Sequence, residues 1–133
     1  MQLQFDTNAL LRYTTNDVPK EADIVEILIK KAKDGTVSLY ICEPIFIETA
    51  VMLKQYFKFP KGKIVSVLSF LINSPELNIE NRQNLLRALG VYAEYSVDFV
   101  DCVLLVRAQT QGRQVFTFDS KLALLASSQE KAN

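Results

Sequence analysis

The sequence predicts one α/β domain in three layers, in which helices cover both sides of a mainly parallel central sheet. Short runs rich in β-forming residues alternate along the chain with longer runs whose apolar residues recur at helical spacing. A length of 133 residues suits one domain, and 49% hydrophobic with 23% charged residues is typical of a folded globular protein. Right-handed crossovers in such a fold place the carboxyl ends of the strands along one edge.

The first expected element is a strand over residues 3–6, which ends on a carboxylate. Asn16 or Asp17 can cap a helix that begins near Pro19, because proline is tolerated in the first turn of a helix. Gly35 is a natural end for this helix, since glycine readily adopts the left-handed conformation after a last turn. The chain is therefore expected to begin with a strand followed by a helix.

The middle of the chain is expected to hold two strands and two helices. The β-rich run VSLYIC predicts a strand over residues 37–42, and Pro44 opens the helix after it. Glu48 stands in that helix among apolar neighbours. Three of these neighbours are expected to face inward: Ile47, Val51 and Met52. Helical spacing resumes over residues 64–72, and a short strand is expected over residues 77–79.

Three helices and one strand are expected after residue 80. Asn81 can cap the first helix, and Ser96 or Asp98 can cap the second, which runs to Gln111. The remaining elements are expected in this order: a strand over residues 115–118, a helix over residues 121–126 and a polar tail over residues 127–133. The folded domain is therefore expected to span residues 1–126.

The chain contains no histidine, which excludes Ser-His-Asp and Cys-His catalysis and the familiar histidine-based zinc sites. The formal net charge of zero gives no support to a broadly basic surface. Cys42 and Cys102 lie in apolar runs and are expected to be buried thiols of a cytoplasmic protein. The N-terminus lacks the features of a signal peptide, and no apolar run approaches the roughly twenty residues that span a bilayer.

Five acids are expected to lie towards one edge of the sheet. Asp6 and Asp119 end predicted strands, Glu48 follows another, and Asp98 and Asp101 share one face at a helix start. Taken singly, each acid could be a helix cap, a turn residue or half of an ion pair. Together they would repel one another, and a divalent cation relieves such repulsion. Mg²⁺ and Mn²⁺ prefer oxygen ligands, and ions of this kind can activate water to cut a phosphodiester.

Four segments of the chain are similar, in the same order, to blocks of a known family: FDTNALLRY at residues 5–13, IETAVML at 47–53, VDFVDCVLLVRA at 97–108 and VFTFDSKL at 115–122. With these blocks the sequence resembles the PIN-domain nucleases, and especially their VapC-like toxin branch. The resemblance implies a PIN-like α/β/α fold. It also implies an acidic site made of Asp6, Glu48, Asp101 and Asp119, with Asp98 assisting them.

The same resemblance implies a cytoplasmic endoribonuclease that uses one or two Mg²⁺ or Mn²⁺ ions. Such a protein is usually the toxin of a type II toxin–antitoxin pair, binds a cognate antitoxin and is often a homodimer. Asn8 and Thr117 match polar positions that support the site in the family, and Arg12 falls where the family often has arginine. Cys102 departs from the small residue that is commoner after the principal acid.

A basic and aromatic stretch follows Glu48, with no acid before Glu76. It comprises Lys54, Tyr56, Phe57, Lys58, Phe59, Lys61 and Lys63. Such a stretch could hold an RNA backbone and stack a base. It could equally be a helix end with packed aromatics and solvated lysines, or part of a groove for an antitoxin or a second copy.

Two other functions are compatible with the same α/β fold. The first is a non-catalytic PIN-like scaffold for protein interactions, although degenerate members of such a fold typically lose their acids. The second is a receiver-like phosphoacceptor, which is suggested by a lysine, Lys121, shortly after Asp119. Receivers carry paired acids after the first strand, whereas only Asp6 ends the first strand here.

Overall fold

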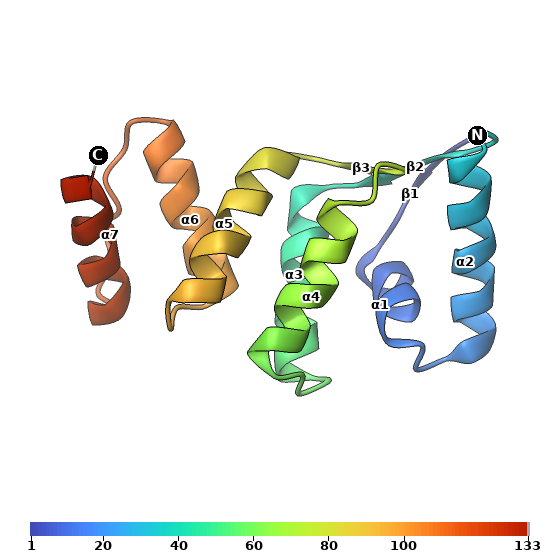
Figure 1. The fold of residues 1–133 in the computed structure, drawn as a ribbon, viewed down its shortest axis with the longest axis horizontal. Helices are drawn as coiled ribbons and strands as arrows, with labels where there is room; N and C mark the ends of the chain where they lie inside the picture. The colour runs from blue at the N-terminus through green and yellow to red at the C-terminus, as the bar shows by residue number, and fades with distance from the viewer. Residues whose placement is uncertain (133) are drawn as a thin grey trace. The chain divides into compact units, whose positions relative to one another are not determined.

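The computed structural model describes residues 1–132, and the side chains of residues 1–129. The described residues form seven helices and three strands (Figure 1), which confirms the predicted α/β class. The chain divides into two compact units, which we call the N-terminal unit (Met1–Arg82) and the C-terminal unit (Gln83–Asn133). No helix within residues 1–132 has both the length and the apolar character needed to cross a bilayer.

The N-terminal unit contains a three-stranded sheet. Its strands are β1 (Gln2–Gln4), β2 (Ser38–Ile41) and β3 (Leu77–Ile79), in the order β1-β2-β3 with both pairs parallel. The register aligns Leu3 with Leu39 and Leu39 with Leu77, and the last two are fully buried. Because all three strands run in one direction, their carboxyl ends share one edge, and this confirms the predicted parallel sheet.

Four helices accompany this sheet: α1 (Thr7–Thr15), α2 (Pro19–Lys33), α3 (Glu43–Gln55) and α4 (Lys61–Ile72). The core lies where α1, α3 and α4 meet, with Leu10, Phe46 and Leu68 fully buried. The buried residues of α3 are Phe46, Thr49, Ala50 and Leu53, together with Glu43 at its first position. The expected inward residues Ile47, Val51 and Met52 are only half-buried, because the helix is rotated to bury the neighbouring stripe.

The first helix, α1, corrects the sequence interpretation of residues 7–17. Neither Asn16 nor Asp17 caps α2, whose N-cap residue is Val18. Asn16 instead ends α1 in the left-handed conformation, with φ 54°. Asp17 accepts hydrogen bonds from Arg12. The local cap signals therefore belong to an additional helix, α1, that the sequence analysis did not predict.

The C-terminal unit is helical in its described part. Its helices are α5 (Arg82–Glu94), which begins at the boundary between the units, α6 (Phe99–Thr110) and α7 (Ser120–Ala132). Of the two predicted caps of α6, Ser96 and Asp98, Asp98 occupies the N-cap position, although its side chain does not form the cap hydrogen bond. The Asn81 side chain, expected to cap α5, instead donates to Glu43 Oε2 at 2.5 Å.

The strand predicted over residues 115–118 is not formed, and this prediction was wrong. Residues 113–119 are irregular, with Phe116 and Phe118 84% and 95% exposed. A strand needs a neighbour to complete its hydrogen bonds, and no other segment among the described residues of this unit is a strand. The last helix, α7, reaches Ala132 rather than Ala126, so residues 127–132 are helical where a tail was expected, and Asn133 lies outside the described residues.

Candidate active site

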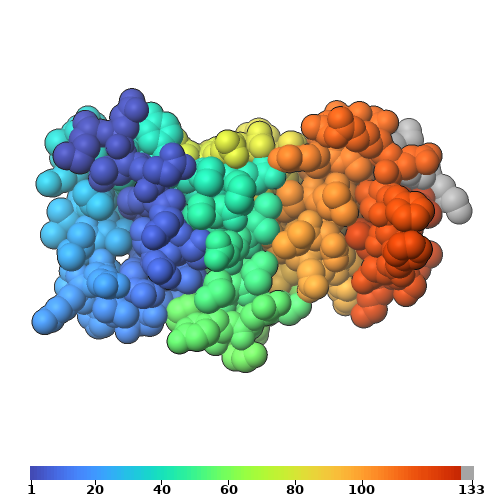
Figure 2. Space-filling view, turned by 180° about the vertical axis from the view of Figure 1, so that it is seen from behind, coloured from blue at the N-terminus to red at the C-terminus, as the bar shows by residue number. Residues whose placement is uncertain are grey.

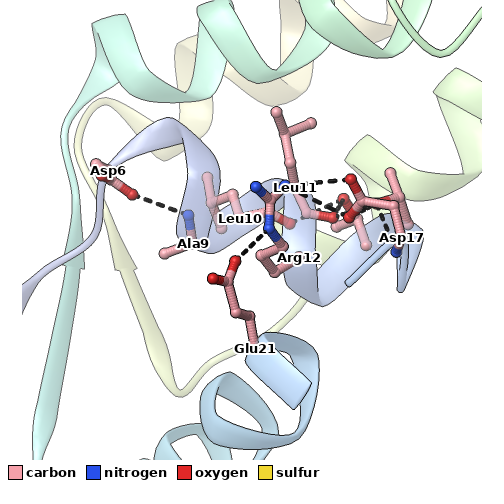
Figure 3. A network of polar contacts seen from close by, with 9 residues as sticks. Asp6, Ala9, Leu10, Leu11, Arg12, Asp17 and Glu21 are labelled. Carbon is pink, nitrogen blue, oxygen red and sulfur yellow. Dashed lines mark hydrogen bonds and ion pairs between the residues drawn. The ribbon is translucent and has the colours of Figure 1, made fainter. Parts of the chain in front are cut away.

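Asp6, the first predicted acid, follows β1 and begins α1. Its Oδ1 accepts a hydrogen bond from the Ala9 backbone N–H at 2.8 Å, which caps the helix (Figure 3). The partial positive charge at a helix N-terminus also favours a carboxylate there. The strand end and the cap together fix Asp6 at the carboxyl edge of the sheet, while the residue itself is exposed.

The second predicted acid, Glu48, lies in the second turn of α3 and is exposed rather than packed among apolar residues. Its Oε2 accepts a hydrogen bond from the Thr7 hydroxyl at 3.0 Å. Because Thr7 directly follows Asp6 in the chain, this bond brings Glu48 beside the start of α1. The N-terminal unit therefore brings Asp6 and Glu48 together through Thr7.

Thr7 is a residue that the sequence analysis missed in favour of Asn8. Asn8 is exposed in the first turn of α1, one position beyond the threonine that contacts Glu48. The useful signal was the position of a hydroxyl residue immediately after a strand-end acid. The partner of that hydroxyl, Glu48, lies 41 residues away in the chain, so local spacing could not show that Thr7 contacts it.

The C-terminal unit holds the other three predicted acids at the starts of two helices. Asp98 is the N-cap of α6, and Asp101 lies in its first turn. Asp119 stands before α7 and accepts a hydrogen bond from the Leu122 backbone N–H at 2.9 Å. Burial raises the pKa of the Asp101 carboxyl above its ordinary value, and the negative charges of Asp98 and Asp119 raise it further. Asp98 and Asp119 therefore each lie close enough to Asp101 to disfavour its charged form.

Thr117, predicted to support the site, contacts Asp119 through the backbone. Its hydroxyl oxygen accepts a hydrogen bond from the Asp119 N–H at 3.0 Å. This local turn fixes the chain just before α7. Thr117 therefore positions the backbone of Asp119 in the C-terminal unit, as Thr7 positions the carboxylate of Glu48 in the N-terminal unit.

Arg12 lies away from the predicted acids of its own unit. Its guanidinium donates to Glu21 Oε1 at 2.6 Å and to Asp17 Oδ2 at 3.2 Å, and the hydrogen bond to Glu21 is the largest cause of its raised pKa. Figure 3 shows Asp6 at the start of α1 and Arg12 towards its other end. The structure therefore uses Arg12 to join α1 to α2.

Two further glutamates follow strands at the same edge and were not singled out from the sequence. Glu43 follows Cys42, which is the first residue after β2, and is 6% exposed. Its backbone N–H donates to Glu80 Oε1 at 3.1 Å. Asn81 donates to the Glu43 carboxylate. These bonds join the ends of β2 and β3, so both acids have structural partners. The sequence signal was an acid one or two residues after the end of each of these strands. Within residues 1–132, no disulfide joins Cys42 to Cys102.

The four predicted RNA-binding lysines lie around the turn between α3 and α4. Lys54 is in the last turn of α3, and Lys58 is in the turn itself with φ 58°. Lys61 and Lys63 begin α4. The Lys63 ammonium lies 3.9 Å from the centroid of the Phe59 ring, a distance typical of a cation–π contact. The turn therefore gathers all four cations at one end of a helical hairpin.

The five acids suit a hard divalent cation in kind, because all their donor atoms are carboxylate oxygens. Burial is the largest cause of the raised pKa of Asp101, and a bound cation would relieve the further rise that the charges of Asp98 and Asp119 cause. The acids are divided between the units, two in the first and three in the second. Within each unit alone, the described residues place no group of three or more acidic or cysteine side chains in position to hold a metal ion.

Comparison with known proteins identifies the class. The family model of the PIN domain matches residues 4–127, nearly the whole chain. The protein therefore belongs to the PIN domain family, and its α/β fold with a parallel sheet is consistent with a PIN-like α/β/α domain. PIN domains are generally metal-dependent nucleases that act on RNA or DNA, which supports a hydrolase. No curated protein matches the chain.

Proposed function

We propose that this protein is a cytoplasmic endoribonuclease that depends on Mg²⁺ or Mn²⁺. The observation that carries the proposal is the match of residues 4–127 to the PIN domain family, in a chain that has all five acids that its resemblance to that family implied. Such a group is suited to a cation rather than to side-chain chemistry alone. The absence of histidine from the sequence points the same way, because no imidazole is available as a base.

In this proposal, Asp6, Glu48, Asp101 and Asp119 would hold one or two ions, with Asp98 assisting. A bound ion would supply an activated water and charge neutralisation at the scissile phosphate. Thr7 keeps a Glu48 oxygen oriented by donating to it. The α7 cap fixes one Asp119 oxygen in the same way. These bonds prepare the carboxylates before the ion arrives, so less ordering is needed on binding.

The turn between α3 and α4 is the part of the N-terminal unit best suited to RNA. Figure 2 shows it in green, projecting from its unit. Tyr56 is 69% exposed and lies edge-on to Phe57, with ring centroids 5.0 Å apart, and Phe57 is 6.0 Å from Phe59. Four lysines and no acid between Glu48 and Glu76 make this region positively charged, which attracts a phosphate backbone.

Cleavage assays with single-stranded and structured RNAs test the nuclease proposal directly. We expect cleavage with Mg²⁺ or Mn²⁺, none after EDTA, and none by Asp101→Asn or Asp6→Asn. Asp23→Asn is the matched control, because it removes an exposed acid of α2 outside the proposed site. Cleavage that survives EDTA, or that Asp101→Asn leaves intact, would overturn the mechanism. No cleavage with either ion would favour a non-catalytic scaffold.

We further propose that the protein is the toxin of a type II toxin–antitoxin pair and forms a homodimer. Exposed apolar side chains support partner binding in the N-terminal unit: Ile24 and Ile27 on α2 and Phe70 on α4 are all more than half exposed. We expect expression to arrest growth and a neighbouring small gene to relieve the arrest. Sedimentation would measure the oligomeric state. Unaffected growth with an active nuclease would exclude the toxin role.

A further inference from the structure

The C-terminal unit contains a cavity of about 260 Å³ that the proposed chemistry does not use. One wall is the segment between α5 and α6, with Tyr95 and Val97, and the other is the first half of α7, with Lys121, Leu124 and Leu125. Two serines, Ser96 and Ser128, complete its lining. The cavity is therefore largely apolar, with a ring, an ammonium group and two hydroxyls around it.

Each wall of this cavity includes a residue that lies one or two positions along the chain from a proposed site acid. Val97 immediately precedes Asp98, and neighbouring Cα atoms are about 3.8 Å apart. Lys121 lies two residues after Asp119, in the first turn of α7. The cavity therefore lies on the same two segments of the chain as Asp98 and Asp119, although its lining residues include neither acid. We call this cavity the α7 pocket.

The lining of the α7 pocket suits a nucleobase. A base is flat and aromatic on its faces and polar at its edge, so it stacks on tyrosine, packs on aliphatic groups and bonds to hydroxyls. Leu125 is buried at the pocket, whereas Tyr95 and Leu124 are 38% and 74% exposed and accessible to a ligand. The exposed ammonium of Lys121 complements a negatively charged phosphate. A nucleotide carries such a phosphate, whereas an apolar peptide side chain does not.

We propose that the α7 pocket receives the base of a nucleotide next to the scissile phosphate of single-stranded RNA, with Tyr95 as the stacking surface and Lys121 on a flanking phosphate. This inference rests on the proposed nuclease function and adds a base-recognition site to it. The pocket then selects where the RNA is cut, while the acids supply the reaction. Base stacking on an aromatic side chain is strong enough to affect binding several-fold or more.

Binding of a short fluorescent single-stranded RNA to the full chain in EDTA, measured by anisotropy, tests the pocket without cleavage. We expect Tyr95→Ala to weaken binding about 5- to 100-fold, and Tyr95→Phe to restore it because the ring remains. Leu124→Glu places a negative charge at the pocket and is expected to weaken binding as well. Leu86→Glu is the matched control, an exposed leucine of α5 that does not line the pocket.

Sequencing of the cleavage products gives a second readout. We expect Tyr95→Ala and Lys121→Ala to change the preferred base at one position beside the cut. If Tyr95→Ala does not fold, Leu124→Glu at its exposed position carries the test. Wild-type cleavage with unchanged RNA binding and unchanged cut sites in all these variants overturns the pocket alone. A Leu124→Glu variant that loses binding to a protein partner but keeps its binding to RNA also overturns the pocket. Tyr95-dependent RNA binding by a protein that cuts no RNA overturns the nuclease instead.

Discussion

In the N-terminal unit, Asp6 and Glu48 each accept a hydrogen bond, from the Ala9 backbone and from the Thr7 hydroxyl. In the C-terminal unit, Asp119 likewise accepts a hydrogen bond from the Leu122 backbone N–H, but burial raises the pKa of Asp101, and the negative charges of Asp98 and Asp119 raise it further. Donors stabilise a carboxylate as an anion, whereas neighbouring anions destabilise it. Both units therefore fix an acid by a helix-cap hydrogen bond, and in the C-terminal unit the charged form of Asp101 also carries an energetic penalty from burial and from its acidic neighbours.

The largest expected effect comes from removing one charge of the repelling group. Asp101→Asn should lower the rate of RNA cleavage by more than the roughly 10- to 100-fold typical of groups that only orient a ligand. The same change should stabilise the metal-free protein against urea, by less than about 1 kcal/mol because solvent screens the repulsion. Asp23→Asn controls for the loss of an exposed acid. A metal-free protein destabilised by Asp101→Asn would contradict this comparison.

A smaller loss is expected from the donor that orients Glu48. Thr7→Val removes the hydroxyl at nearly constant volume and should slow cleavage about tenfold or more, with a weaker apparent affinity for Mn²⁺. Mn²⁺ titration of the cleavage rate measures both. Thr14→Val is the matched control in α1, because its hydroxyl donates to the Leu10 carbonyl instead. Equal effects of the two variants would assign Thr7 to helix stability alone.

A smaller effect, on stability, is expected from the hydrogen bond by which Asp6 caps α1. Asp6→Ala removes the acceptor for the Ala9 N–H and should cost about 1 kcal/mol of unfolding free energy, whereas Asp6→Asn keeps an acceptor and most of that stability. Urea unfolding of the metal-free protein separates the two variants, and both should lose cleavage. Equal stability of the two variants would show that the cap contributes nothing.

The smallest expected effect is a pH dependence of opposite sign in the two units. The Thr36 hydroxyl, its backbone N–H and the charge of Lys31 lower the pKa of Asp34. Its contribution to stability is therefore present at neutral pH and is lost as the pH falls through the lowered pKa. The raised pKa of Asp101 gives a penalty that is present at neutral pH and vanishes in acid.

Melting temperatures between pH 7 and about pH 3 test both signs. Thr36→Val should lower the melting temperature slightly at pH 7, and the difference from wild type should shrink in acid. Asp101→Asn should raise it slightly at pH 7, and this difference should also shrink. Thr14→Val serves as the pH-independent control. A Thr36→Val defect that grows in acid would reverse the sign assigned to Asp34.

Local pattern was sufficient for the parallel sheet, because β-rich runs separated by helical runs admit few other arrangements. It also placed acids at the ends of strands and helices. It failed where a partner far along the chain decides the outcome. Glu48, for example, is oriented by Thr7 across 41 residues. The partners of Arg12 are nearer, Asp17 before α2 and Glu21 within it, 5 and 9 residues along the chain.

The segment at residues 115–118 shows the same limit of local pattern, here in a strand that was predicted and is not formed. Its β-forming residues predicted a strand, yet strand formation depends on a neighbouring backbone as well as on local preference. Similarly, Asp6 is the N-cap of α1, and a helix cap was one of the roles that the sequence left open for this strand-end acid. One residue here serves as the strand-end acid and as the helix cap, and spacing alone does not separate these roles.

The register of the sheet also has a consequence for the order of folding. Leu3 pairs with Leu39, 36 residues later, and Leu39 pairs with Leu77, 38 residues later. Contacts so distant in sequence form slowly, because a long loop must close before any strand pairing stabilises it. On a ribosome, the sheet is completed only after residue 79 has emerged. Asp6, synthesised among the first residues, therefore reaches its final environment only once about 70 further residues have been made.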